Sequence, residues 1–183
     1  AGARFYMDTL VRRAAALSGL AAENMTRGQN WLFLELGRRI ERALLMLRYT
    51  QRFGRPDAPV GSLDTLLELS DASISYRQRY NIAATQASVL DLVVLDPNNP
   101  RSVAFQTERI RKTVMDLPGR RGSGEPSDID SLIVRLDAVL RTTRAVDVDE
   151  ALIERCADDL RQLSDLLTEQ YFSDRNIPVG DWE

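Results

Sequence analysis

The residues with the clearest chemical potential lie between Trp31 and Phe53, around the run Gly37-Arg38-Arg39-Ile40-Glu41-Arg42-Ala43. On a helical wheel of about 100° per residue, Glu41 falls inside the apolar arc of this segment and Arg38 at its edge. An isolated buried ion is very costly, so Glu41 is expected to meet a cation or a hydroxyl group. The candidate partners, from this segment and a later one, are Arg38, Arg77, Arg79, Tyr76 and Tyr80.

Three interpretations of this cluster remain open. The first is a polar pocket that binds an anionic or peptide-like ligand, and the second is a buried network that fixes how two helices dock. Under the second, Glu41→Ala is expected to cost about 3–5 kcal/mol. In the third, Glu41 has its pKa shifted by burial and acts as an acid or base in amide chemistry. No other catalytic residue is expected. The candidate ligand- or partner-binding residues are Arg38, Glu41, Arg42, Tyr76, Arg77, Arg79 and Tyr80.

The composition excludes several classes of site. The chain of 183 residues has no histidine and one cysteine, which rules out Cys-His and Ser-His nucleophiles and histidine zinc sites within it. No group of Asp and Glu residues has the loop spacing of a Mg²⁺ or Ca²⁺ site, so no metal and no cofactor are expected. Cys156 lies on an apolar stripe and is expected in the core.

The charge and hydropathy patterns argue against nucleic acid and membrane as partners. The net charge is −3, and the arginines are scattered among acidic residues rather than gathered on a ridge with aromatic side chains. No apolar run approaches the roughly 20 residues of a membrane helix, and no basic-then-apolar leader opens the chain. We therefore expect a cytoplasmic protein. The Gly- and Arg-rich stretch 118–126 lacks a GK[ST] ending and a preceding strand, so it predicts a linker rather than a phosphate-binding loop.

Helical periodicity runs through the whole chain, and no segment alternates as a strand does. Helices are expected at 3–25, 31–53, from Ser62 to about Leu69, 73–95, from Pro100 to about Leu117, and in two final segments that form an antiparallel hairpin. The prediction is an all-α bundle of about six or seven helices with mostly antiparallel neighbours. It forms a single domain over 1–172, followed by an irregular tail at 173–183.

Local signals give three further expectations. Asn30 is expected to be the N-cap of the central helix, and Asn99 the N-cap of the helix that Pro100 begins. Gly37 in mid-helix is unfavourable by roughly 1 kcal/mol relative to alanine, which predicts the close approach of a neighbouring helix.

Several of these segments together resemble the bacterial alpha-E family, a predicted all-helical domain of unknown function with an ER motif. The motif corresponds here to Glu41-Arg42. The matching segments occur in the family's order and cover most of residues 15–118. They are Ser18–Gly28, Trp31, Phe33-Leu34, Gly37–Ala43, Tyr76–Tyr80, Val89–Leu92, Leu95-Asp96 and Asn99–Gln106.

The resemblance implies a context rather than a reaction. The family's domain is longer and has an earlier ER-type segment, so this chain resembles its C-terminal portion. A site between two ER helices would then be completed by another chain, for example in a homo-oligomer. Alpha-E domains occur fused to, or encoded beside, circularly permuted ATP-grasp proteins and transglutaminase-like proteins, in systems predicted to make or modify peptides.

The leading hypothesis is thus a non-catalytic helical module. It would bind a circularly permuted ATP-grasp protein or its peptide substrate. The alternatives are a subunit of an amide-bond-forming or peptide-modifying enzyme, and a purely structural domain.

Overall fold

The all-α prediction is confirmed. The computed structural model describes residues 2–118 and 126–173, and within them every regular element is a helix. The helices are α1 (Gly2–Asn24), α2 (Gln29–Phe53), α3 (Ser62–Leu69), α4 (Ser73–Tyr80), α5 (Gln86–Leu90), the π-helical turn η1 (Asp91–Leu95), α6 (Val103–Met115), α7 (Asp128–Thr142), the 3-10 turn η2 (Ala145–Asp147) and α8 (Glu150–Phe172).

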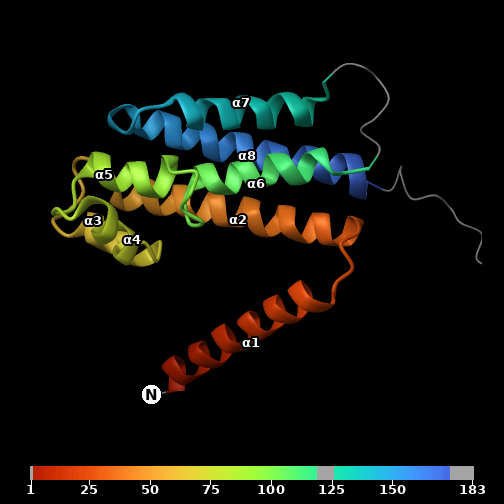
Figure 1. Cartoon of the computed structure of the whole chain (residues 1–183), viewed down its shortest axis with the longest axis horizontal. Coiled ribbons are helices and arrows are strands. Elements are labelled where there is room, and N and C mark those ends of the chain that lie inside the picture. Colours follow the sequence, from red (N-terminus) through yellow and green to blue (C-terminus); the bar gives the residue numbers. More distant parts are fainter. Residues whose placement is uncertain (1, 119–125, 174–183) are drawn as a thin grey trace, which may run out of the picture.

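The bundle is built around α2. Helices α6 and α8 pack against α2, α7 covers α6 and α8, and the short helices α3 and α4 lie at one end (Figure 1). The side chains that α2 buries recur at helical spacing, which is why the sequence forms one long amphipathic helix here. They are Leu36, Ile40, Ala43, Met46, Leu47 and Thr50. This face, together with the buried leucines and isoleucines of α6, α7 and α8, forms the hydrophobic core.

The last two helices form the predicted antiparallel hairpin (Figure 1). Helix α7 begins with a capping box in which Ser127 and Asp130 each accept a hydrogen bond from the other's backbone N–H. The N-cap of helix α8 is Asp149, whose carboxylate accepts a hydrogen bond from the Leu152 N–H at 2.7 Å. Cys156 is buried on the inner face of α8, as predicted.

The prediction of a single helix at 73–95 is wrong, because the helix is interrupted between Tyr80 and Gln86. Asn81 ends α4 in the left-handed conformation with φ of 49°, which asparagine tolerates better than most residues. Thr85 then starts α5 by accepting a hydrogen bond from the Ser88 N–H. This extra break is one reason the structure has more helices than predicted.

Both predicted N-caps are also wrong. Helix α2 starts two residues earlier than expected, with Gly28 as its N-cap, so Asn30 lies within the first turn. Helix α6 starts after Ser102, whose hydroxyl accepts a hydrogen bond from the Phe105 N–H at 3.0 Å. The Asn99 side chain instead holds a buried turn, where it donates to the carbonyl of Leu92 at 2.8 Å.

Helix α1 stands apart from the bundle (Figure 1) and buries none of its residues. Its apolar side chains are exposed, among them Phe5 at 73% and Leu17 at 70%.

The close approach predicted at Gly37 is not found, since a Cβ built there would meet nothing within 4 Å. Most of the predicted linker at 118–126 and of the predicted tail at 173–183 lies outside the described residues. Within the described part of the chain, no helix has the length and apolar character needed to span a membrane.

Candidate functional site

Glu35, rather than Glu41, is the acid that anchors the arginines of α2. Its Oε2 accepts hydrogen bonds from Arg39 Nε at 3.2 Å and Arg39 Nη2 at 3.0 Å, and its Oε1 accepts one from Arg38 Nη1 at 3.3 Å. The three side chains share a flank of the helix because Arg38 and Arg39 lie three and four residues after Glu35. All three are half-buried, with exposed fractions of 17–29%.

Arg39 connects this cluster to α6. Its Nη1 donates a hydrogen bond at 3.2 Å to Oε1 of Gln106, a side chain with no exposed surface. The amide of Gln106 in turn donates to the carbonyl of Pro100. Glu35, Arg39 and Gln106 therefore form a network that docks α2 against α6.

Arg42 lies on the same flank of α2 and is exposed. It forms no hydrogen bond or ion pair with the described residues. Partial desolvation of its guanidinium group lowers its pKa, and repulsion from Arg39, Arg38 and Arg101 lowers it further. Arg101, in the loop before α6, lies at 2.8 Å from the carboxylate of Asp71. The positive charge around Arg42 is thus only partly neutralised.

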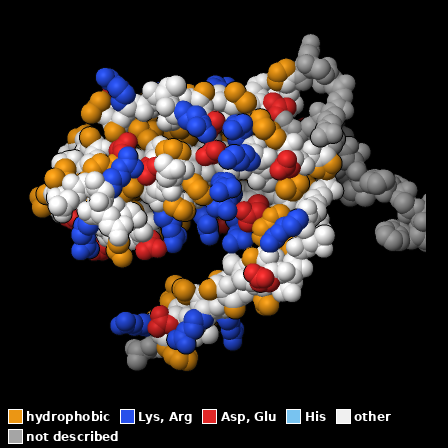
Figure 2. Space-filling view, in the orientation of Figure 1, with side chains coloured by type: hydrophobic (Ala, Val, Ile, Leu, Met, Phe, Trp, Pro, Cys, Tyr) orange, Lys and Arg blue, Asp and Glu red, His pale blue; other side chains and the backbone are white. Residues whose placement is uncertain are grey.

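The cluster extends along α6. The guanidinium group of Arg109 lies 5.1 Å from the centre of the Phe105 ring, and that of Arg39 lies 5.9 Å from the same ring. We call the five arginines of this surface the basic flank: they are Arg38, Arg39, Arg42, Arg101 and Arg109. Basic side chains gather over α2 and the adjoining part of α6 (Figure 2), although the chain as a whole is acidic, with a net charge of −3.

The prediction that Glu41 is buried and paired is wrong. Glu41 is exposed and forms no ion pair or hydrogen bond with the described residues. The buried face of α2 is rotated toward Arg39 and Ala43 relative to the face drawn on the helical wheel, so Leu44 is only half-buried and Leu45 is 43% exposed. Glu41 therefore lies away from the basic flank, beside a cavity of about 300 Å³ between α2 and α8.

Two of the predicted residues on α4 form a separate network. Arg79 donates to Asp96 at 2.6 Å and to Asp91 at 2.9 Å. The Tyr80 hydroxyl also donates to Asp91. Burial raises the pKa of Tyr80, and the hydrogen bond to Asp91 adds to the shift. These contacts hold α4 against η1 and the turn that follows it.

Tyr76 and Arg77 have different surroundings again. The buried Tyr76 hydroxyl donates to the carbonyl of Ala83 at 3.1 Å and lies 2.6 Å from the Ser88 hydroxyl, so it stabilises the break between α4 and α5. Arg77 is exposed and forms no pair with the described residues. No hydrogen bond or ion pair within the described part of the chain joins these α4 residues to the basic flank. The seven predicted residues therefore do not form one hydrogen-bonded network among the described residues.

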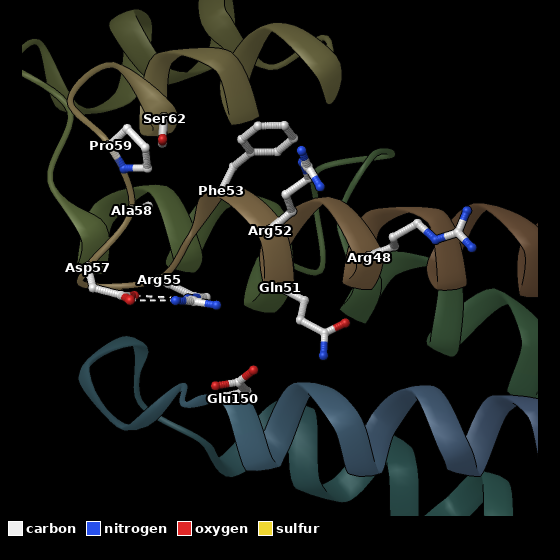
Figure 3. Close-up of a pocket in the computed structure, with 10 residues that line it drawn as sticks. All are labelled: Arg48, Gln51, Arg52, Phe53, Arg55, Asp57, Ala58, Pro59, Ser62 and Glu150. Carbon is white, nitrogen blue, oxygen red and sulfur yellow. Dashed lines mark hydrogen bonds and ion pairs between the residues drawn. The ribbon is translucent and has the colours of Figure 1, made fainter.

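A hollow lies elsewhere, at the C-terminal end of α2 (Figure 3). It has a volume of about 660 Å³. Arg55 and Asp57 form an ion pair on its rim, and Glu150 at the start of α8 faces it from the opposite side (Figure 3). No group of three or more Cys, Asp or Glu side chains among the described residues is arranged to hold a metal ion.

The residues that organise these networks are not among the predicted site residues. Glu35 falls on the polar side of the helical wheel, although its spacing from Arg38 and Arg39 is a signal for pairing. Gln106 and Asp96 give no comparable signal, because their partners are distant in the sequence.

The fold and the site define an all-helical domain with a charged ER-containing helix at its centre. The chain belongs to the Alpha-E family, described as a predicted alpha-helical domain with a conserved ER motif, which matches residues 3–172.

The chain is also similar to uncharacterised proteins of Mycobacterium bovis and of two strains of Mycobacterium tuberculosis. Each is 31% identical over 166 residues, which cover 88% of this chain. The chain spans only 18% of the length of these relatives. No solved structure matches it.

Proposed function

We propose that this domain is a non-catalytic binding module that recognises carboxylate groups of a partner through the basic flank. The partner would be a circularly permuted ATP-grasp protein or its peptide substrate, within a system that makes or modifies peptides. A cytoplasmic location, where ATP is available, forms part of the proposal.

The observation that carries the proposal is the electrostatic environment of the Arg42 guanidinium group. It lies beside three other arginines and has no anionic partner of its own among the described residues, and its pKa is lowered. Repulsion between these like charges is unfavourable, and a bound anion would relieve it. Guanidinium groups also suit this role, because each offers several N–H donors in a planar array that matches a carboxylate.

The network beneath this surface supports the same proposal. Glu35 and Gln106 hold Arg39 in place, and Glu35 also contacts Arg38. Arginines fixed in this way lose less side-chain entropy when they bind a ligand. The docking role and the binding role are therefore compatible, with Arg39 mainly structural and Arg42 available to a partner.

The proposal is tested by calorimetric titration of the chain with a circularly permuted ATP-grasp protein encoded beside it. The double variant Arg38→Gln/Arg42→Gln should weaken binding by about tenfold or more, the equivalent of about 1.4 kcal/mol, and binding should weaken with added salt. Arg48→Gln is the matched control, because Arg48 is an exposed arginine of the same helix outside the basic flank. Absence of binding by the folded wild-type chain, or equal losses in both variants, would contradict the proposal.

A further inference from the structure

Helix α1 carries a row of apolar side chains that the bundle leaves uncovered. Its members are spaced by four and three residues in turn, the heptad repeat with which helices pack in coiled coils. This heptad row of α1 consists of Ala3, Met7, Leu10, Ala14, Leu17 and Ala21. None of them is buried, and α1 diverges from the bundle toward its N-terminal end (Figure 1). Because most helices in proteins are stabilised by packing of their apolar face, this row points to a partner helix.

Helix α2 has a second row with the same repeat, on a side away from its buried face. The members of this outer row of α2 are Leu34, Gly37, Glu41, Leu44, Arg48 and Gln51, and none of them is buried. The last four line the cavity of about 300 Å³ between α2 and α8. None of the six belongs to the basic flank, so carboxylate binding and packing on the outer row involve different residues.

Gly37 is the member of the outer row that most clearly indicates a helix partner. A glycine inside a helix is unfavourable relative to alanine, yet a Cβ at position 37 would meet nothing within 4 Å. No contact within the described residues therefore requires glycine at this position. A glycine between Leu34 and Leu44 would instead allow a second helix to approach closely and would leave room for one of its large side chains.

The connection between α1 and α2 sets the register in which the two rows would meet. Only four residues separate the helices, so in antiparallel packing the end of α1 lies opposite the start of α2. Both helices rise about 1.5 Å per residue. This register places Leu17 opposite Gly37 and Leu10 opposite Leu44, so a large side chain meets the space at the glycine.

The charges beside the two rows are complementary in the same register. Arg13 flanks the heptad row of α1 and comes opposite Glu41 of the outer row. Both residues are exposed, and neither forms an ion pair with the described residues. Arg12, the neighbouring arginine, lies on the opposite side of α1 from the heptad row.

The connection also holds α1 away from its own α2. Arg27 donates to the carbonyl of Ala22 in the last turn of α1, and its guanidinium group lies 3.8 Å from the centre of the Trp31 ring in the first turn of α2. The Gly28 N–H donates to the carbonyl of Thr26 at 2.7 Å. Because these contacts keep the two helices apart, the outer row of α2 is open to α1 of another copy.

We propose that two copies of this chain exchange α1, so that α1 of each copy packs antiparallel on the outer row of the other. An exchanged helix makes the contacts that it would make in a closed hairpin, so the register is preserved. Standard interfaces involve about 20–30 residues on each side. Each copy contributes about half of the 23 residues of α1 and the nine residues that line the cavity, which together reach the lower end of this range. Because the two contacts are reciprocal, the assembly closes as a dimer.

Sedimentation velocity over a range of concentrations, together with hydrogen exchange, tests this inference. The chain should pass from monomer to dimer as its concentration rises, with no larger species. The amides of α1 should exchange fast in the dilute monomer and become protected in the dimer. A chain that stays monomeric would overturn the proposal, and protection of α1 in that monomer would show that it packs on its own α2. Larger species that grow with concentration would also overturn it, because they indicate a head-to-tail contact.

Two glycine variants locate the contact on α2. Gly37→Gln should raise the dimer dissociation constant about tenfold or more, because the new side chain would occupy the space that Leu17 of the other copy fills. The monomer should stay folded, since that space is open within one chain. The matched control Gly19→Gln, also in open space but on the side of α1 away from the heptad row, should leave dimerisation unchanged. Equal effects of the two variants would contradict the assigned contact.

Charge variants test the register. Arg13→Glu should weaken the dimer several-fold, whereas the matched control Arg12→Glu should not. Adding Glu41→Arg to Arg13→Glu should restore dimerisation, because the two charges then attract again. Equal losses for the two arginine variants, or no recovery in the double variant, would show that the register is wrong.

Discussion

Replacing Glu35 by alanine should destabilise the fold more than replacing Glu41. Glu35→Ala removes hydrogen bonds of 3.0 and 3.2 Å to Arg39 and of 3.3 Å to Arg38. Ion pairs of partly exposed residues contribute about 0.5–1 kcal/mol each, so the loss should be about 1–2 kcal/mol. Glu41 has no such contact with the described residues, and Glu41→Ala should change stability by less than about 0.5 kcal/mol.

Both variants make the same substitution in one helix, so the difference in helix propensity cancels between them. Urea unfolding followed by circular dichroism measures both free energies, and in a chain of this length 1 kcal/mol corresponds to roughly 2–4 °C in melting temperature. The difference between the variants should shrink at high salt, where ion pairs are screened. A larger loss for Glu41→Ala than for Glu35→Ala would refute the placement of α2 against α6.

Three further predictions concern other parts of the chain. Arg79→Leu leaves the buried Asp96 without its cation and should cost about 2 kcal/mol or more by urea unfolding, whereas Arg77→Leu should be nearly neutral; equal losses would contradict the α4 network. Burial raises the pKa of Cys156 from 9.0 to about 11, so the folded chain should resist alkylation at pH 8. Because the folded state holds that proton more tightly than the unfolded state, stability should fall between about pH 9 and pH 11 in wild type and less in Cys156→Ala. Hydrogen exchange should be fast throughout Gly2–Asn24, which buries no residue, and protection there equal to that of α2 would be inconsistent with its exposure.

The long helices could be predicted from sequence because their apolar residues repeat at helical spacing over many turns. This is true of α1, α2 and the α7–α8 hairpin. The break after Tyr80 could not be predicted in this way, because the apolar pattern of α4 continues into α5. What ends α4 is the left-handed Asn81, and Tyr76 stabilises the break through contacts that form only after folding.

The site was harder to predict than the fold. A helical wheel gives the order of side chains around α2 but not the direction from which α6 and α8 approach it. The environment of charged residues near the apolar arc is therefore the hardest to predict, and Glu41, which was expected inside that arc, is exposed. The pairing of Arg39 with Gln106 joins residues 67 positions apart, for which a single sequence carries no signal.

The most direct test of the basic flank is the response of its arginines to a carboxylate ligand. The Nε–Hε signals of the arginine side chains can be followed by NMR during titration with a short polyglutamate peptide. The structure predicts that the signals of Arg42 and Arg38 shift together and saturate, while the signal of Arg48 stays in place. Equal, non-saturating shifts at all arginines, or no shift at Arg42, would contradict the proposed function.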